Sequence, residues 1–370
     1  MKVLTQLSRI LVGTLFILSG FIKANDTIGF SYKLVEYFEI FHWDLFVPYA
    51  ELLSIVICIF EIMVGVALLL GAYSKWNAWL LLLMILFFTW LTGYSALTGK
   101  VTDCGCFGDA VKLAPFESFL KDLVLLVFIL IIFIGQKHIK PLFNLTIQGI
   151  ALFIGLIVTT AFTVYTYMFL PRIDFLPYKI GNDISSLMQI PEGAPRDSVQ
   201  MVFIYEKGGQ QVEFTMEQID DIDDSYTFVD RKDKLIRKGY TPPIHDFKLY
   251  DAAGTEYTDT LLADQGFKLI LVQKSIAESR RIEKSIAELA AQWQAAGNSF
   301  WALTASPADQ VEPYRHEHQL AFPYYTMDGT PLKSMVRSNP GLMLMRGNVV
   351  VQKWGAYNFP TFETVKKYMR

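Results

Sequence analysis

Five long apolar runs in the first 170 residues restrict the fold of this chain more than any other feature. A helix that crosses a bilayer needs about 20 mostly apolar residues. We expect the first run to be retained rather than cleaved as a signal peptide, because it is long and ends in Lys23 without a small-residue cleavage motif. The sequence therefore predicts five transmembrane helices in a lipid bilayer, at approximately 5–24, 50–71, 77–98, 115–135 and 146–170.

Composition agrees with this division of the chain. The 370 residues are 52% hydrophobic and 19% charged, against roughly 25% charged in an ordinary soluble domain. Residues 171–370, however, have the charge density of a soluble domain. A net charge of −3 gives no indication of a nucleic-acid partner. With Cys58, Cys104 and Cys106 as its cysteines, the chain cannot be a disulfide-stapled scaffold.

Basic residues gather at alternate ends of the predicted spans. One set of ends carries basic side chains and no acid, namely Lys2, Arg9, Lys75, Lys137, His138 and Lys140. Cytoplasmic loops are the ones enriched in lysine and arginine. We therefore expect a multi-pass inner-membrane protein with its N-terminus in the cytoplasm. The loop at 25–49, the loop after the third span and the C-terminal domain would then face the periplasm.

The loop after the third span contains Cys104-Gly105-Cys106. Two thiols separated by one glycine can close a small ring, for which Gly105 supplies the backbone freedom. Strained or exposed disulfides are the labile, catalytic kind. A static disulfide or two buried thiols are the alternatives. No metal is expected, because a closed zinc site needs about four ligands and no histidine or further cysteine lies close by.

Three segments resemble DoxX-like membrane proteins. Ser19-Gly20-Phe21-Ile22-Lys23 is similar to their first helix, and Glu61-Ile62-Met63-Val64-Gly65 to their second. The segment Asp103-Cys104-Gly105-Cys106-Phe107-Gly108-Asp109 resembles the signature of the MauE-type members, and the resemblance covers about 1–135. It implies membrane-bound thiol redox chemistry for periplasmic partner proteins. Cys104 and Cys106 would then be the reactive pair, supported by Asp103, Gly105, Phe107, Gly108 and Asp109.

The layout of these helices is also similar to that of vitamin K epoxide reductase and of bacterial quinone-coupled thiol oxidases. Those proteins use a C-x-x-C centre near a quinone. This chain has C-x-C and no second outer cysteine pair. The sequence therefore establishes no cofactor, and a quinone remains one candidate.

Glu61 lies near the middle of the second predicted span, where an unpaired ionisable group is costly. Lys23 is close to the outer end of the first span, and it can snorkel or reach toward Glu61. Two roles remain open for these charges. They form a proton relay or quinone contact beside the thiols, or they form a purely structural ion pair. Cys58, one turn before Glu61, is either a third thiol or, as we favour, a small apolar residue.

Aromatic residues crowd the outer loop at 25–49. Aromatic side chains concentrate at membrane interfaces. We expect this loop to lie on the membrane surface and to cover the cysteines, and a quinone pocket is the less favoured alternative. The aromatic residues are Tyr32, Tyr37, Phe38, Phe41, His42, Trp43 and Tyr49.

Strand and helix patterns alternate after residue 171. Gly208-Gly209 between two strand-like runs, Val199–Tyr205 and Gln211–Phe214, predicts a hairpin. Further on, we expect a long amphipathic helix at Ile276–Ala296 and a final helix after Pro360. The expected strands are Phe247–Tyr250, Lys268–Gln273, Phe300–Thr304, Gly341–Arg346 and Val349–Trp354.

This βαβ and ββα order resembles the thioredoxin fold. Ser338-Asn339-Pro340-Gly341 stands where that family places a cis-proline. The family's C-x-x-C would follow the strand that ends at Gln273, but Lys274–Ser279 contains no cysteine. The resemblance implies a docking or structural role for this domain.

We therefore predict a membrane α-helical bundle followed by an α/β thioredoxin-like domain. The expected domains are a four-helix DoxX/MauE-like domain at 1–140, a fifth transmembrane helix at 141–171, a periplasmic β-rich insertion at 172–243 and the thioredoxin-like domain at 244–370. The predicted function is electron exchange with periplasmic thiols and disulfides through Cys104 and Cys106. The alternative is a non-catalytic scaffold whose outer domain recruits a partner protein.

Overall fold

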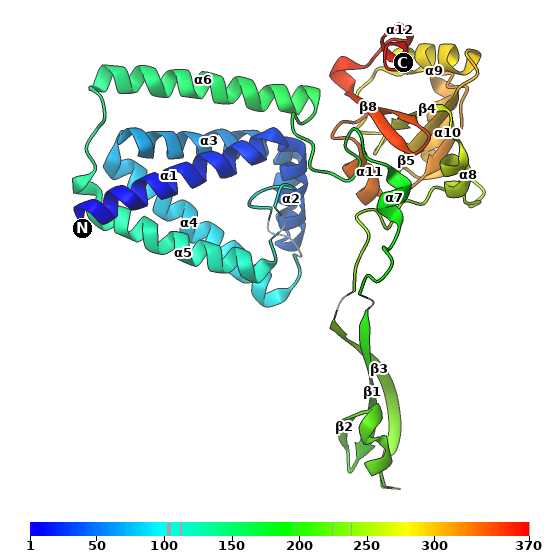
Figure 1. Cartoon of the computed structure of the whole chain (residues 1–370), viewed down its shortest axis with the longest axis horizontal. Coiled ribbons are helices and arrows are strands. Elements are labelled where there is room, and N and C mark those ends of the chain that lie inside the picture. The colour runs from blue at the N-terminus through cyan, green and yellow to red at the C-terminus, as the bar shows by residue number, and fades with distance from the viewer. Residues whose placement is uncertain (102–104, 112, 196, 224, 238, 370) are drawn as a thin grey trace. The chain divides into compact units, whose positions relative to one another are not determined.

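Figure 1 shows the computed structural model of the chain, which describes residues 1–101, 105–111, 113–195, 197–223, 225–237 and 239–369. The chain divides into two compact units. The first comprises Met1–Asn182 and Phe247–Arg370, and it contains a helical bundle and an α/β domain. The second, Asp183–Asp246, contains a three-stranded sheet.

Among the described residues, five helical segments are long and apolar enough to cross a membrane. They are α1 (Lys2–Asn25), α3 (Ala50–Leu70) with the preceding 3₁₀ turn η1 (Asp44–Tyr49), α4 (Ser74–Thr98), α5 (Pro115–Gly135) with η2 (Gln136–His138), and α6 (Leu145–Phe169). The five predicted spans are therefore confirmed as helices, with ends that differ by a few residues. The protein is a multi-pass membrane protein.

Glycines let α1 and α3 pack with their backbones in close approach. A Cβ added at Gly65 would lie 2.9 Å from the carbonyl oxygen of Gly13, and one added at Gly20 would lie 3.3 Å from that of Cys58. Small residues have this use in membrane helices, where close packing replaces the hydrophobic driving force. Gly13, Gly20 and Gly65 therefore set the distance between these two helices.

The segment at 25–49 forms a helix, α2 (Thr27–Ile40), where the sequence predicted a surface loop. The helix begins there because the Asp26 side chain accepts a hydrogen bond of 2.8 Å from the backbone N–H of Gly29, an N-cap contact. A Cβ added at Gly105 would lie 3.0 Å from Cγ of Lys33 on this helix. Helix α2 therefore lies beside the segment that carries Cys106.

Arg9 is a buried residue of α1, 4% exposed, and not part of a loop. Its Nε donates to the carbonyl of Leu68 at 2.8 Å, and its Nη2 donates to that of Leu69 at 2.6 Å. A cation that bonds the last carbonyls of a helix is favoured by the helix dipole. Arg9 therefore caps α3 and does not count among the loop charges that predicted orientation.

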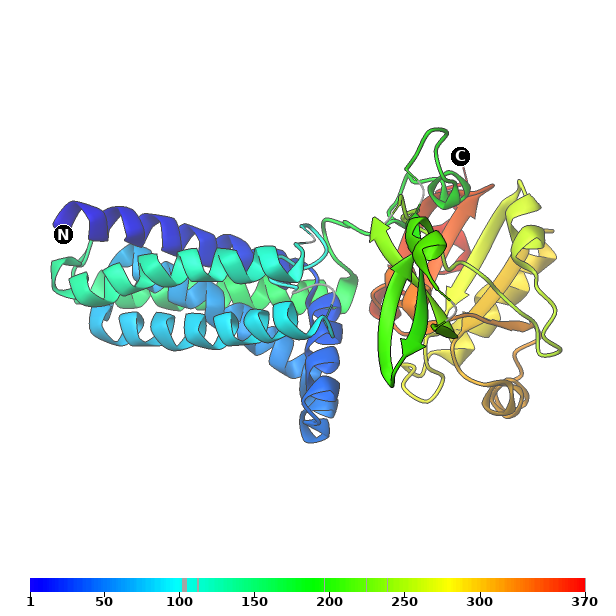
Figure 2. The same ribbon diagram turned by 90° about the horizontal axis from the view of Figure 1, so that it is seen from below.

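The α/β domain contains a five-stranded sheet in the order β6-β5-β4-β7-β8. Strand β4 is parallel to β5, and β5 to β6, whereas β7 is antiparallel to both β4 and β8. The strands lie side by side in Figure 2. Their bounds are β4 (Phe267–Val272), β5 (Ser299–Thr304), β6 (Tyr324–Thr326), β7 (Gly341–Arg346) and β8 (Val349–Gly355).

Helices connect and cover these strands. They are α8 (Thr258–Ala263), α9 (Glu283–Ala295), α10 (Ala308–Glu317), α11 (Gly329–Met335), η4 (Ala356–Asn358) and α12 (Phe362–Lys366). The parallel β4-α9-β5 unit followed by the β7-β8 hairpin and α12 is a thioredoxin-like arrangement, as predicted. The Asn339–Pro340 peptide bond is cis, at the expected place.

Two predictions about this domain were wrong. Phe247–Tyr250 is not a strand; within it, Tyr250 makes isolated bridges to Glu256 and Thr326. The chain turns back there because the Asp251 side chain accepts hydrogen bonds from the N–H groups of Ala253 and Thr255.

The amphipathic helix begins at Glu283 and not at Ile276. The N–H of Ile276 bonds to the side chain of Ser306, and the N–H of Arg280 bonds to the carbonyl of Asn339. Tertiary hydrogen bonds thus take the place of the helical ones before Glu283.

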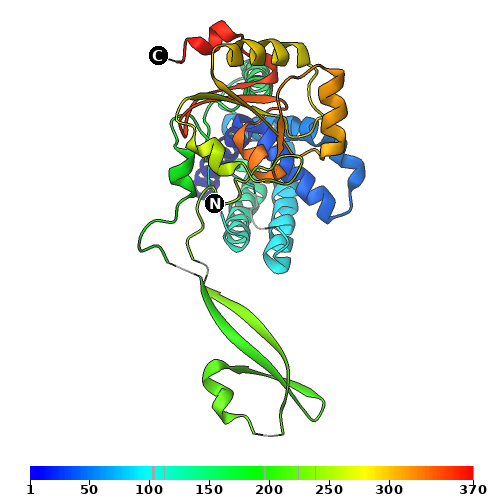
Figure 3. The same cartoon turned by 90° about the vertical axis from the view of Figure 1, so that its right-hand side faces the viewer.

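The second unit contains the predicted hairpin. Strands β1 (Ser198–Lys207) and β2 (Gln210–Thr215) are antiparallel, and β3 (Thr227–Arg237) pairs with the other edge of β1 (Figure 3). The turn places Gly208 and Gly209 at φ of 61° and 82°, the left-handed region that glycine adopts readily. The unit also contains α7 (Ile184–Met188) and η3 (Met216–Asp221).

Candidate functional site

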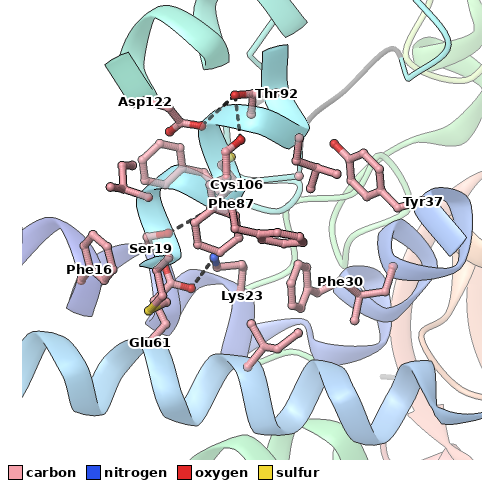
Figure 4. Close-up of a pocket in the computed structure, with 18 of the residues that line it drawn as sticks. Phe16, Ser19, Lys23, Phe30, Tyr37, Glu61, Phe87, Thr92, Cys106 and Asp122 are labelled. Atoms are coloured by element: carbon pink, nitrogen blue, oxygen red, sulfur yellow. Dashed lines mark hydrogen bonds and ion pairs between the residues drawn. The ribbon is translucent and has the colours of Figure 1, made fainter. Parts of the chain in front are cut away.

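An apolar pocket lies inside the helical bundle, with a volume of about 300 Å³. Side chains from α1, α2, α3, α4 and α5 line it together with the 105–107 segment (Figure 4). Its walls are mostly aromatic and aliphatic. The polar or charged side chains among the lining residues are Ser19, Lys23, Tyr37, Trp43, Glu61, Thr92, Cys106, Lys121 and Asp122.

Cys106 is part of the pocket wall, and the hydroxyl of Ser19 on α1 donates a 3.0 Å hydrogen bond to its carbonyl oxygen. The backbone on both sides is left-handed, with φ of 68° at Gly105 and 51° at Gly108. Glycine is the residue that accepts this conformation without a steric penalty. Glycines therefore shape the turn that presents Cys106 to the pocket.

The structure describes some of the remaining residues of the predicted cysteine motif and leaves others undescribed. Asp103 and Cys104 lie outside the described residues, so the expected pairing of Cys104 with Cys106 stays a prediction. Phe107 lines the pocket, and the Lys121 ammonium lies 5.4 Å from the centre of its ring. Asp109 is within 2.5 Å of the Arg337 guanidinium.

Lys23 and Glu61 form an ion pair across α1 and α3, and both side chains are 4% exposed. The Lys23 ammonium also lies 5.4 Å from the ring centre of Phe30 and 5.5 Å from that of Phe88. The predicted approach of these two charges is therefore confirmed. Because an isolated charge in this environment is expensive, each of the two requires the other.

Cys58 is fully buried next to Ala24 and Ile62, and it does not line the pocket. This environment agrees with its reading as a small apolar residue.

Asp122 is a site residue that the sequence analysis missed. In the structure Asp122 is 1% exposed and lines the pocket. Its Oδ1 is 2.6 Å from Nζ of Lys121, and its Oδ2 is 3.0 Å from the hydroxyl of Thr92 on α4. An acidic residue within an apolar run was the available signal.

Arg337 of the α/β domain bonds to two acids of the bundle. Its Nε is 2.8 Å from Asp26 Oδ2, and its Nη2 is 2.5 Å from Asp109 Oδ2. Burial alone would lower the pKa of Arg337, but Asp26 and Asp109 raise it above its ordinary value. Asp109 therefore has a structural partner in addition to its place in the cysteine motif.

Lys274 follows β4, where a thioredoxin fold would begin its C-x-x-C. Its Nζ donates a 2.7 Å hydrogen bond to the hydroxyl of Tyr32 on α2. Burial, helped by the charge of Arg337, lowers the pKa of Lys274 to about 7. This end of the sheet therefore presents a buried amine in place of thiols.

The described residues thus form a multi-pass membrane bundle joined to a thioredoxin-like domain. The bundle contains an apolar pocket with a few charged side chains in its wall. Residues 1–135 match the family model described as methylamine utilisation protein MauE, which supports the predicted MauE-type membrane domain. Residues 199–238 match a domain of unknown function (DUF8463) and coincide with β1, β2 and β3. A comparison with curated proteins finds no match.

Two solved structures are similar to parts of the chain. One is a hypothetical protein from Sinorhizobium meliloti 1021, with 19% identity and a TM-score of 0.25 over 29% of this chain and 66% of that one. The other is the peroxidoxin BcpB from Mycobacterium tuberculosis, with 14% identity and a TM-score of 0.26 over 34% of this chain and 90% of that one. These scores are low, so the thioredoxin-like assignment depends on the strand order of the sheet.

Proposed function

We propose that this protein is an inner-membrane thiol oxidoreductase. Cys104 and Cys106 take electrons from the thiols of periplasmic proteins and deliver them to a lipid-soluble quinone in the bundle pocket. One observation carries this proposal: Cys106 lines an apolar pocket that also contains buried charged groups. A pocket of about 300 Å³ is at the lower end of the range typical for small ligands.

The pocket suits a flat aromatic ring. Phe30, Phe87 and Phe88 are among its lining residues. Aromatic side chains prefer offset-stacked or edge-to-face contacts with other rings. When bound there, a quinone would accept two electrons and two protons.

The chain supplies those electrons and protons in balance. When the thiols of Cys104 and Cys106 form one S–S bond, they release two electrons and two protons. The resulting disulfide is reduced again by two thiols of a partner protein, which become a disulfide in turn. The partner must be a separate molecule, because the outer domain contains no cysteine.

The ends of the helices support the orientation that this function requires. Hydrogen bonds from Gln6 to the carbonyl of His138 and from Leu142 to that of Leu70 hold the start of α1, the end of α3 and the connection between α5 and α6 at one end of the bundle. Lys2, Lys75, Lys137 and Lys140 lie in or next to these segments. Under the positive-inside rule this end is cytoplasmic. The Cys106 segment then faces the periplasm, where disulfides persist.

Thiol trapping tests the proposal. In cells, the Cys106→Ala variant should accumulate mixed disulfides on Cys104, because the resolving thiol is missing. Cys58→Ala is the matched control, and it should leave the redox cycle of the pair unchanged. If Cys104 never forms an adduct and the pair never changes its redox state, the protein is not a thiol oxidoreductase.

The alternative is a membrane scaffold whose α/β domain recruits a partner, with a static Cys104–Cys106 pair. The cysteine-free outer domain favours this alternative. It predicts that a Cys104→Ala/Cys106→Ala double variant retains full biological activity, whereas the oxidoreductase requires that activity to be lost.

A further inference from the structure

We propose that Asp122 is the residue that transfers protons between the pocket and the membrane surface. This inference rests on the proposed function, because it concerns the protons that accompany thiol oxidation in the same pocket. Asp122 lines the pocket with Cys106 (Figure 4) and has Thr92 and Lys121 as its polar neighbours.

Thr92 can form a hydrogen bond with Asp122 in both protonation states of the carboxyl group. The Thr92 hydroxyl lies 3.0 Å from Asp122 Oδ2 and 2.9 Å from the carbonyl oxygen of Phe88 one turn earlier on α4. When Asp122 is ionised, the hydroxyl donates to the carboxylate. When Asp122 is protonated, its O–H donates to Thr92 Oγ1, and the Thr92 hydrogen turns to Phe88. A hydroxyl is both a donor and an acceptor, so the proton can come and go without a side chain moving.

The two ion pairs found among the described residues of the pocket differ in how far they are exposed at the surface of the bundle. Lys23 and Glu61 are both 4% exposed, so neither partner of that pair reaches the surface of the bundle. Asp122 is 2% exposed at its side chain, but its partner Lys121 is 25% exposed. The Asp122 pair therefore reaches from the pocket wall to the surface of the bundle, and it is the better route for protons.

The proton balance of the reaction defines the role of Asp122. Two thiols that form a disulfide release two protons, and a quinone that becomes a quinol gains two. Glu61 and Asp122 are the carboxylic acids among the described lining residues, and Asp122 is the one whose partner reaches the bundle surface, so it can exchange these protons with the outside. General acid–base groups of this kind typically contribute 10²–10⁴-fold to a rate, which is roughly the loss expected without Asp122.

The test separates the two half-reactions in purified protein. The first is disulfide exchange with a small dithiol in the absence of quinone, and the second is quinol formation with a water-soluble ubiquinone analogue. Asp122→Asn should slow quinol formation about 100-fold and leave the exchange unchanged. Asp122→Glu should recover part of the rate, since it restores the carboxyl group. Glu117→Gln, an exposed acid on the same helix, is the control and should behave as wild type.

A spectroscopic readout makes the assignment independent of turnover. The infrared difference spectrum between the oxidised and reduced cysteine pair should contain a carboxyl band that Asp122→Asn removes and Thr92→Val shifts. Wild-type quinol formation by Asp122→Asn, or an unchanged infrared spectrum, overturns the inference. Loss of both half-reactions together with a lowered melting temperature shows a structural role and also overturns it. If wild type lacks the exchange reaction itself, the proposed function fails first.

Discussion

The membrane bundle and the α/β domain place their buried ion pairs in different surroundings. The bundle holds the ion pairs Lys23–Glu61 and Lys121–Asp122 around a cavity. In the α/β domain, the core residues on β4, β5 and β7 are buried apolar side chains, and the buried Arg337 pairs with two acids of the bundle. Buried ion pairs rarely add stability over apolar residues of similar size. The two pairs that surround the cavity therefore indicate where the bundle places function ahead of stability.

The largest effect is expected for removal of one charge of the Lys23–Glu61 pair. Glu61→Leu leaves the Lys23 ammonium buried and unpaired, which should lower the free energy of unfolding by about 3–5 kcal/mol. The double variant Lys23→Met/Glu61→Leu should recover most of this loss, because no unpaired charge is left. Denaturant unfolding in detergent measures both. Equal stability of Glu61→Leu and wild type would remove the contrast between the two regions.

The next largest effect is expected for a cavity in the α/β core. Leu344 on β7 is fully buried, so Leu344→Ala should cost about 2–5 kcal/mol. Val349→Ala on β8, where the side chain is 37% exposed, is the comparison and should cost less than about 1 kcal/mol. Thermal unfolding followed by circular dichroism measures both losses. Comparable costs at the two sites would contradict a close-packed core.

The pH dependence of stability tests Lys274. Its pKa of about 7 in the folded protein lies below that of an unfolded lysine, near 10.4. Between these values the unfolded chain binds the proton and the folded chain does not, so this group makes stability rise with pH. Below about pH 7 both states are protonated and the penalty is constant.

Lys274→Met should therefore stabilise the protein most below pH 7, and the gain should disappear as the pH approaches 10.4. Melting temperatures of both proteins across this pH range provide the measurement. A gain that is independent of pH would show that the amine of Lys274 is not desolvated.

The smallest effect is expected for an exposed ion pair. Lys284 and Glu288 on α9 are 4.0 Å apart, with side chains 91% and 61% exposed. Lys284→Ala should change the free energy of unfolding by no more than about 0.5 kcal/mol, because solvent screens the pair. The same denaturant titration as for Glu61→Leu makes the two pairs directly comparable. A loss as large as that of Glu61→Leu would show that burial does not set the value of these pairs.

The sequence was sufficient for features that depend on local patterns. The spans follow from apolar runs, the β1-β2 hairpin from Gly208-Gly209, and the approach of Lys23 to Glu61 from two charges in adjacent spans. Helix α2 was missed because its start depends on one capping contact of Asp26 within an aromatic-rich segment.

The rest depends on contacts between distant segments. Asp122 was missed because its hydrogen-bond partner in the pocket, Thr92, lies 30 residues earlier in the chain. Likewise, the helix expected from Ile276 is delayed by hydrogen bonds to Ser306 and Asn339. No window of sequence around these residues contains their partners.

The Arg9 cap has a consequence for how the bundle assembles. When α1 first enters the bilayer, the carbonyls of Leu68 and Leu69 that satisfy its guanidinium have not yet been synthesised. A buried charge is costly until it is paired. The first helix therefore settles into its final position only after α3 has joined it. The capping contact therefore forms about 60 residues after Arg9 itself has been synthesised.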